Sequence, residues 1–112
     1  MKKIEAIVRP EKVDPVRAAL EGVGYPGLMI TEISGHGRQK GVTQQWRGES
    51  YRLDILPKVK LEIVVPDKDF EKILKVITES AATGNVGDGK IFVTEVVQAV
   101  RIRTGERGEP AL

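Results

Sequence analysis

A strand-like segment followed by a proline and an amphipathic helix occurs twice along the chain. Residues 3–8 (KIEAIV) and 60–65 (KLEIVV) match in residue type, and a proline follows each of them closely. Apolar residues then recur at intervals of three and four, the spacing of one helical face. Two strand–helix–strand units predict a β-α-β-β-α-β chain. Chance likeness between short apolar strands is the alternative, but it leaves the shared order of strand, proline and helix unexplained.

The predicted fold class is therefore α+β. It is a ferredoxin-like double split βαβ unit, with a four-stranded antiparallel sheet and two helices on one face. The first helix is expected to start with a cap at Asp14 and to stop at Gly24. The second is expected to start at Asp67 or Asp69 and to end by Thr83.

Two further apolar segments complete the predicted sheet, a strand at 28–33 and a long final strand at 90–102. With both helices on one face, the other face of the sheet is left uncovered. Because the strands at 28–33 and 90–102 are rich in Val, Ile and Leu, we expect another subunit to cover that face. The 112 residues are expected to form a single domain, residues 1–112, that assembles into an oligomer.

The composition excludes several classes of function. There is no cysteine and His36 is the only histidine, so disulfides, thiolate metal sites and a serine–histidine triad are not expected. A net charge of +2 does not predict nucleic-acid binding, and strands 3–8 and 60–65 lack aromatic residues for stacking on RNA bases. No apolar run approaches the ~20 residues needed to cross a bilayer. We expect a cytoplasmic protein that is not membrane-embedded and binds no nucleic acid.

Residues 83–90 (TGNVGDGK) contain three glycines and end in a lysine. Gly84, Gly89 and Lys90 have the spacing of a phosphate-binding P-loop, but Ile91 follows where Ser or Thr is required, and the order is helix to strand. The segment is therefore not a Walker A site. Closely spaced glycines can still turn successive N–H groups toward one anion, with Lys90 adding charge. A plain glycine turn with a solvated lysine explains the same residues equally well.

Arg101 and Arg103 are two residues apart in the predicted final strand, so their guanidinium groups would share a face. Each hydrogen bond from a guanidinium to a phosphate is worth ~1.5–3 kcal/mol, enough to anchor a nucleotide tail. Ion pairs with Glu95 or Glu106 are the alternative and the commoner case.

The connection at residues 37–56 is long and polar, and it carries Trp46 and Tyr51. Such connections are usually functional or disordered, and aromatic residues on a mobile loop suit partner recognition or modification. A hairpin lying over the sheet is the alternative. Lys58 follows this connection, where most lysines would be solvent-exposed and an anion site is the less common case.

Several motifs together resemble the nitrogen regulatory protein P-II family, and the resemblance extends from Met1 to Leu112. The motifs are GRQKG at 37–41, RG at 47–48 with Tyr51, LPKVK at 56–60, TG at 83–84, GDGKIFV at 87–93 and RIRTG at 101–105. The resemblance implies a homotrimer of ferredoxin-like subunits that binds ATP or ADP in three clefts between neighbours and regulates other proteins. No activated nucleophile stands out, so we do not expect an enzyme. ATP hydrolysis or phosphotransfer on this scaffold is the alternative.

The resemblance also implies which residues bind the nucleotide. Residues 83–90 correspond to the family's B-loop, which holds the phosphates, and Arg101 and Arg103 begin a C-terminal loop, about 101–109, that reaches them from the adjacent subunit. Position 29, next to the adenine, is often Thr in the family and is Met here. The implied nucleotide-binding residues are Met29, Gly35, Gly37, Arg38, Gln39, Val64, Gly87, Asp88, Gly89, Lys90, Arg101 and Arg103.

Residues 37–56 correspond to the family's T-loop, the arm that contacts target proteins. The resemblance implies that 2-oxoglutarate is bound by Gln39, Lys58 and Gly87, with a Mg²⁺ ion held by Gln39, ATP and this acid. ATP with 2-oxoglutarate would favour one loop conformation and ADP another. Tyr51 matches the tyrosine that a uridylyl- or adenylyltransferase modifies. Implied targets include an ammonium transporter and the enzymes that control glutamine synthetase.

Overall fold

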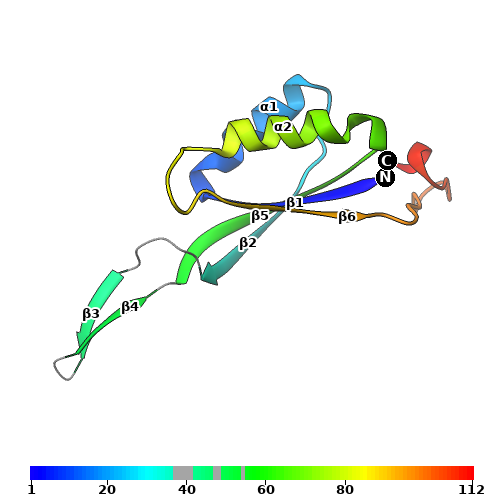
Figure 1. The fold of residues 1–112 in the computed structure, drawn as a ribbon. Coiled ribbons are helices and arrows are strands. Elements are labelled where there is room, and N and C mark those ends of the chain that lie inside the picture. The colour runs from blue at the N-terminus through cyan, green and yellow to red at the C-terminus, as the bar shows by residue number, and fades with distance from the viewer. Residues whose placement is uncertain (37–41, 47–48, 54) are drawn as a thin grey trace.

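A computed structural model of the chain describes the backbone of residues 1–36, 42–46, 49–53 and 55–112, and the side chains of residues 1–33 and 57–112 (Figure 1). Short 3-10 helices lie at Pro10–Lys12, Asp67–Asp69 and Glu109–Ala111. The strands and α-helices are β1 (Lys2–Val8), α1 (Val13–Gly22), β2 (Met29–His36), β3 (Val42–Trp46), β4 (Glu49–Leu53), β5 (Ile55–Val65), α2 (Phe70–Ala81) and β6 (Gly89–Glu95).

The main sheet has four antiparallel strands in the order β2-β5-β1-β6, and both helices lie on one of its faces (Figure 1). The two repeated segments are neighbours at its centre, where β1 pairs with β5 from Lys2 opposite Val65 to Val8 opposite Val59. The ferredoxin-like α+β fold predicted from the repeat is therefore confirmed.

Alternate residues of the two central strands form the core together with one side of each helix. The strands contribute Ile4, Ala6, Val8, Val59, Leu61, Ile63 and Val65, and the helices contribute Val16, Leu20, Ile73, Ile77 and Ala81. Burying each of the larger side chains stabilises the fold by roughly 1.5–3 kcal/mol. The sheet is thereby fixed in register, because a shift by one residue would turn every apolar side chain to the wrong face.

The uncovered face of the sheet carries charged side chains at its centre. Ion pairs of 3.0 to 3.6 Å join them: Lys3–Glu5, Lys3–Glu62 and Lys60–Glu62. On the edge strands, Ile30 lies opposite Leu61 and Val93 opposite Ile4, so these two apolar side chains share the face that the helices cover. Cover of the other face by a second subunit stays a prediction. Two apolar side chains do remain exposed in one row across this face, Met29 of β2 and Phe92 of β6, each 55% exposed.

The final strand is shorter than predicted. β6 ends at Glu95, and the segment predicted to extend it to Ile102 leaves the sheet. β6 is an edge strand whose pairing with β1 ends at Lys2 opposite Glu95, and only one further bond follows, from the Val96 N–H to the Met1 carbonyl at 3.0 Å. Strand length is set here by the partner and not by the β-branched residues that follow.

The helix ends follow the sequence with one correction. α1 begins at Val13, with Lys12 in the N-cap position, so Asp14 lies inside the first turn and caps nothing. Gly24 ends the helix as predicted, with φ of +89°. Asp69 precedes α2 as predicted, but its carboxylate accepts a hydrogen bond from the Tyr25 hydroxyl instead of capping the helix.

The 37–56 connection contains more regular structure than predicted. β2 and β5 continue their pairing to His36 opposite Ile55, and β3 pairs with β4 in a separate two-stranded sheet. A hairpin is therefore present, but the alternative that it lies over the sheet is wrong, because Figure 1 places β3 and β4 beyond the end of the β2–β5 pair. Tyr51 lies in β4 opposite Gln44.

Candidate functional site

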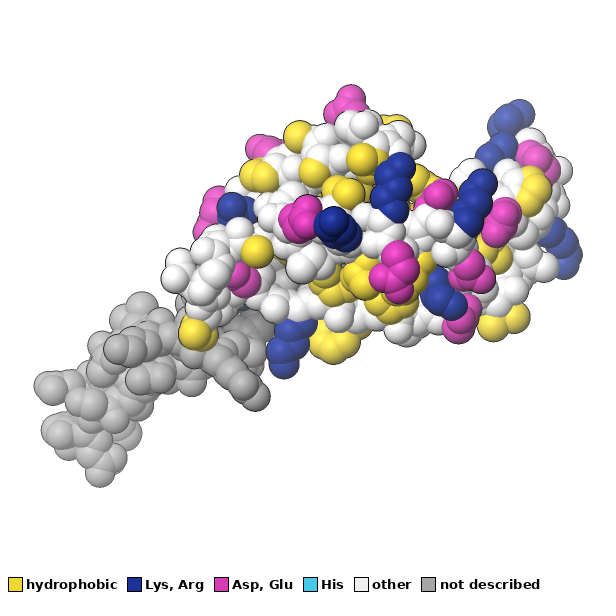
Figure 2. All heavy atoms as spheres, turned by 45° about the horizontal axis from the view of Figure 1, so that its top comes forward, with side chains coloured by type: hydrophobic (Ala, Val, Ile, Leu, Met, Phe, Trp, Pro, Cys, Tyr) yellow, Lys and Arg dark blue, Asp and Glu magenta, His cyan; other side chains and the backbone are white. Residues whose placement is uncertain are grey.

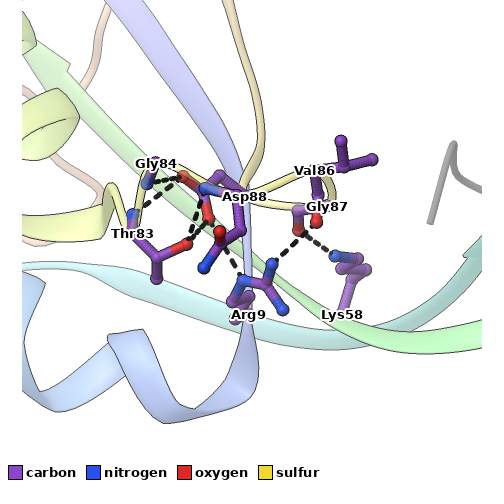
Figure 3. A network of polar contacts seen from close by, with 8 residues as sticks. Arg9, Lys58, Thr83, Gly84, Val86, Gly87 and Asp88 are labelled. Carbon is purple, nitrogen blue, oxygen red and sulfur yellow. Dashed lines mark hydrogen bonds and ion pairs between the residues drawn. The ribbon is translucent and has the colours of Figure 1, made fainter.

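Residues 82–88, here called the glycine loop, connect the end of α2 to the start of β6. The Asp88 carboxylate accepts hydrogen bonds from the N–H groups of Thr83 at 2.8 Å and Gly84 at 2.9 Å, and from the Thr83 hydroxyl (Figure 3). These bonds fold the loop back on itself. Hydrogen bonds from Thr83 above all, with those from Gly84 and Arg9, hold the pKa of Asp88 well below its usual range. Asp88 is therefore an ionised structural group that shapes the loop.

Two glycines determine the path of the backbone through this turn. Gly87 and Gly89 have φ of +97° and +107°, which L side chains rarely adopt. A Cβ at position 89 would also lie 1.7 Å from the carbonyl oxygen of Ile7 in β1. Among the described residues, the N–H groups of Val86, Gly87 and Asp88 donate to no acceptor. Successive N–H groups without partners in such a turn are typical of an anion-binding nest.

Two cations from the neighbouring strands hold the glycine loop from outside (Figure 3). Arg9, at the end of β1, donates from Nε to the Asp88 carboxylate at 3.1 Å and from Nη2 to the Val86 carbonyl at 2.8 Å. Lys58 of β5 donates from Nζ to the Gly87 carbonyl at 2.5 Å. Three segments far apart in the sequence therefore converge on one turn, and two positive charges lie beside its N–H groups.

Lys58 is buried, with 9% of its surface exposed, where the sequence favoured an exposed lysine. Burial lowers the pKa of its ammonium group, and the Arg9 guanidinium lowers it further, against the opposing effects of Glu11 and Asp88. Lys58 also lines a cavity of about 490 Å³ with Pro10, Glu32, Ile33, Pro57 and Val59. A buried cation beside a cavity favours an anionic ligand, because the anion would offset the cost of burying the charge.

The remaining predicted nucleotide-binding residues of the sheet lie near this turn or on the uncovered face. Lys90 is exposed at the start of β6, opposite Ile7. Met29 lies opposite Glu62, and Val64 lies opposite Lys3. Gly35 lies in β2 opposite Leu56. The other three, Gly37, Arg38 and Gln39, fall outside the described residues.

Arg101 and Arg103 do not lie in a strand, so the argument that their side chains share a face is wrong. Arg101 forms an ion pair with Glu106 at 3.1 Å, as the alternative predicted. Both arginines come after the end of β6, whereas the glycine loop precedes its start, and Figure 1 shows the segment after β6 and the turn before it at opposite ends of the sheet. Seven strand residues span roughly 20 Å. A single chain therefore does not bring these arginines to the glycine loop.

Arg9 was not identified from the sequence as a site residue. It precedes Pro10 at the end of the first strand, and nothing in that local pattern marks it as functional. Its partner Asp88 lies 79 positions away. An indirect signal could have identified it: the end of a central strand lies next to the loop that precedes its antiparallel neighbour, so Arg9 was bound to lie near the loop before the last strand.

Charged side chains of both signs are intermingled over the face seen in Figure 2, with no broad area of one sign. Among the residues that the structure describes, no group of three or more acidic or histidine side chains could hold a metal ion. In the same residues, every helix is too short or too polar to span a membrane.

Comparison with known proteins gives one consistent result. The family model described as Nitrogen regulatory protein P-II matches residues 1–106. "Nitrogen regulatory protein P-II" of Haemophilus influenzae is 54% identical over 112 residues, all of both chains. "Nitrogen regulatory protein P-II 2" of Methanothermobacter thermautotrophicus is 53% identical over all of this chain and 97% of its own. "Nitrogen regulatory protein P-II 1" of Escherichia coli is 53% identical over the full length of both chains. The chain therefore belongs to the nitrogen regulatory protein P-II family.

Proposed function

We propose that this chain is a nitrogen-metabolism signal transducer that binds ATP or ADP with its glycine loop. The observation that carries the proposal is the row of N–H groups from Val86 to Asp88, which have no acceptor among the described residues. Arg9 and Lys58 lie beside these groups and fix the turn from outside. Polyphosphate is the ligand class that such a turn suits best, since it accepts several N–H bonds and balances the nearby cations.

The nucleotide site is proposed to form between two copies of the chain. The arginines that would complete the phosphate site follow the end of β6, remote from the copy's own glycine loop. If the arginines of one copy reach the glycine loop of the next, the contact is head-to-tail, and such contacts form a ring when the rotation closes. A homotrimer with three clefts is the assembly that we propose, in accord with the family resemblance.

The second effector is proposed to be 2-oxoglutarate, bound by Lys58 with Gly87 and Gln39. Lys58 is a buried cation already hydrogen-bonded to the Gly87 carbonyl, so a carboxylate that pairs with it would act directly on the glycine loop. Gln39 is proposed to join a Mg²⁺ ion held by the ATP phosphates and the acid, which would neutralise the charge between the two ligands. Because Lys58 lies at the base of the β2–β5 extension, the ligand state could then alter the conformation of the segment at 37–56.

The segment at 37–56 is proposed to contact the target proteins, among them an ammonium transporter or the enzymes that control glutamine synthetase. Modification of Tyr51 by a uridylyl- or adenylyltransferase would add a bulky anion to β4 and block insertion into a narrow partner site. We propose no catalytic step. Absence of phosphate release during incubation with radiolabelled ATP would support regulation over ATP hydrolysis.

Calorimetric titration tests the proposal. ATP with Mg²⁺ is expected to bind the wild-type protein, and 2-oxoglutarate is expected to bind only when ATP and Mg²⁺ are present. Lys58→Gln should abolish binding of the acid, whereas Lys68→Gln, which removes one exposed lysine from the 3-10 helix before α2, should leave both ligands bound. A wild-type protein that ignores ATP, or that binds 2-oxoglutarate tightly without nucleotide, would contradict the proposed site.

A further inference from the structure

Residues 100–108, here called the arginine loop, form a closed turn at the end of the chain. Val100 bridges to Arg107, and the N–H of Gly108 donates to the carbonyl of Ala99 at 2.9 Å. Within the turn, the N–H of Arg101 donates to the carbonyl of Glu106 at 2.9 Å. The segment that carries the two arginines is thus held at its base by backbone bonds.

The Arg101 side chain is part of this framework. Its Nη1 donates to the Glu106 carboxylate at 3.1 Å and its Nη2 to the carbonyl of Pro110 at 3.1 Å. The Thr104 hydroxyl donates to the same carboxylate oxygen at 2.9 Å and accepts from the N–H of Glu106 at 3.2 Å. A guanidinium, a carboxylate and a hydroxyl therefore fix one another, and they join the base of the loop to the residues that follow it.

Arg103 lies in the same turn and is exposed. Its side chain has no hydrogen bond or ion pair with any residue that the structure describes. Its neighbour Ile102 is 99% exposed. The guanidinium groups of Arg103 and Arg107, which is also exposed, thus have no such partner among the described residues, while that of Arg101 holds the loop together.

We infer that Glu106 and Thr104 are positioning residues of the nucleotide site, which hold Arg101 and the arginine loop so that Arg103 reaches the polyphosphate. This inference rests on the proposed function. A loop fixed before binding loses less conformational entropy when it closes on a ligand, so its arginine binds phosphate more tightly than the same residue on a loose segment.

A competing role for Glu106 predicts the opposite change in ATP affinity when its charge is removed. If Arg101 were itself the main phosphate contact, the Glu106 carboxylate would compete with phosphate for its guanidinium. Removing the carboxylate charge would then release Arg101 and strengthen ATP binding. In the positioning role, the same change loosens the loop and weakens ATP binding. The sign of the effect therefore separates the two roles.

The test is calorimetric titration of ATP into wild-type protein and five variants. Glu106→Gln and Thr104→Val are expected to weaken ATP binding about fivefold to tenfold, the usual effect of losing a hydrogen bond to a charged group. Thr104→Ser keeps the hydroxyl and should restore nearly wild-type affinity, a rescue that a general loss of packing would not give. Arg103→Gln should weaken binding about tenfold or more. Glu71→Gln, which removes an exposed acid from α2, controls for net charge and should change affinity less than about twofold.

Circular dichroism of each variant checks that it is folded before titration. Tighter ATP binding by Glu106→Gln would overturn the inference in favour of competition. Affinities of Glu106→Gln and Thr104→Val equal to that of Glu71→Gln would overturn it as well, while leaving the proposed function intact. Absence of ATP binding by the wild-type protein would remove the proposed function and the inference together.

Discussion

Nε of Arg9 lies 3.1 Å from the carboxylate of Asp88, although 79 positions separate the two residues in the sequence. Arg9 follows β1 and Asp88 precedes β6, and these two strands are antiparallel neighbours. The same guanidinium also holds the Val86 carbonyl, so the shape of the glycine loop depends on the pairing of the sheet beneath it.

The Arg9–Asp88 pair is expected to act as a unit in nucleotide binding. Arg9→Gln and Asp88→Asn should each weaken ATP binding about fivefold, since either change releases the turn that aligns the N–H groups. The double variant should weaken ATP binding by less than the product of the two single effects, because the ion pair that the two residues share is lost in either single variant. Titration calorimetry measures this. Effects that multiply in the double variant would show that the two residues act independently.

Asp88 is expected to make stability depend on pH in the acid range. Its pKa is lowered by hydrogen bonds from Thr83, then Gly84 and Arg9, so the folded protein binds this proton less readily than the unfolded chain. The stabilisation is fully present above the ordinary pKa of 3.8 and is lost as the pH falls below it. In urea unfolding at several pH values, Asp88→Asn should lose stability less steeply than wild type between about pH 4 and pH 2. Parallel pH profiles for the two proteins would contradict this assignment.

Gly89 is expected to be the least replaceable glycine among those whose surroundings are described. Its φ is +107°, and a Cβ there would lie 1.7 Å from the Ile7 carbonyl oxygen. Gly89→Ala should lower the free energy of unfolding by about 3 kcal/mol or more. Gly22→Ala is the matched control: this glycine ends α1 with nothing within 4 Å of the new methyl group, so it should stabilise by about 0.5–1 kcal/mol. Denaturant unfolding measures both, and equal effects would contradict the geometry.

The phenol of Tyr25 is expected to lose its proton at a higher pH than an ordinary tyrosine. Burial, and then the hydrogen bond to Asp69, raises its pKa to about 12, so the stabilisation is present below the ordinary value of 10.0 and is lost as the pH rises toward 12. The chain has two tyrosines. In a phenolate absorbance titration, Tyr25→Phe should remove the component near pH 12, and at neutral pH it should cost about 1–2 kcal/mol of stability. Loss of a component near pH 10 instead would place the shifted tyrosine elsewhere.

The central sheet could be predicted from the sequence because its signals are local. The segments at 3–8 and 60–65 are apolar or alternate between apolar and polar residues over the length of a strand. The helices that follow show apolar residues at intervals of three and four, and residues typical of helix ends flank them. The hairpin at β3 and β4 also had a local signal, since only Arg47 and Gly48 separate two segments with β-forming residues. That signal was outweighed by the polarity of the connection.

The features that the sequence did not predict depend on contacts between distant segments. The pairing of β6 with β1 ends at Glu95 opposite Lys2, apart from one bond between the Val96 N–H and the Met1 carbonyl, and no property of residues 96–102 reveals this. Arg9 and the burial of Lys58 likewise follow from how strand ends meet the glycine loop. For the arginine loop, the ion pair with Glu106 could be anticipated as the common case, but not the division of roles between Arg101 and Arg103.

The glycine loop and the arginine loop lie at opposite ends of β6. In a ring of copies joined head-to-tail, every cleft would draw its two halves from different polypeptides. A subunit with a mutated glycine loop would still contribute its intact arginines to the cleft shared with one neighbour. A subunit that lacks Arg103 would still contribute an intact glycine loop to the cleft shared with the other. Two such defective populations, each inactive alone, would therefore complement each other when mixed and regain part of their clefts.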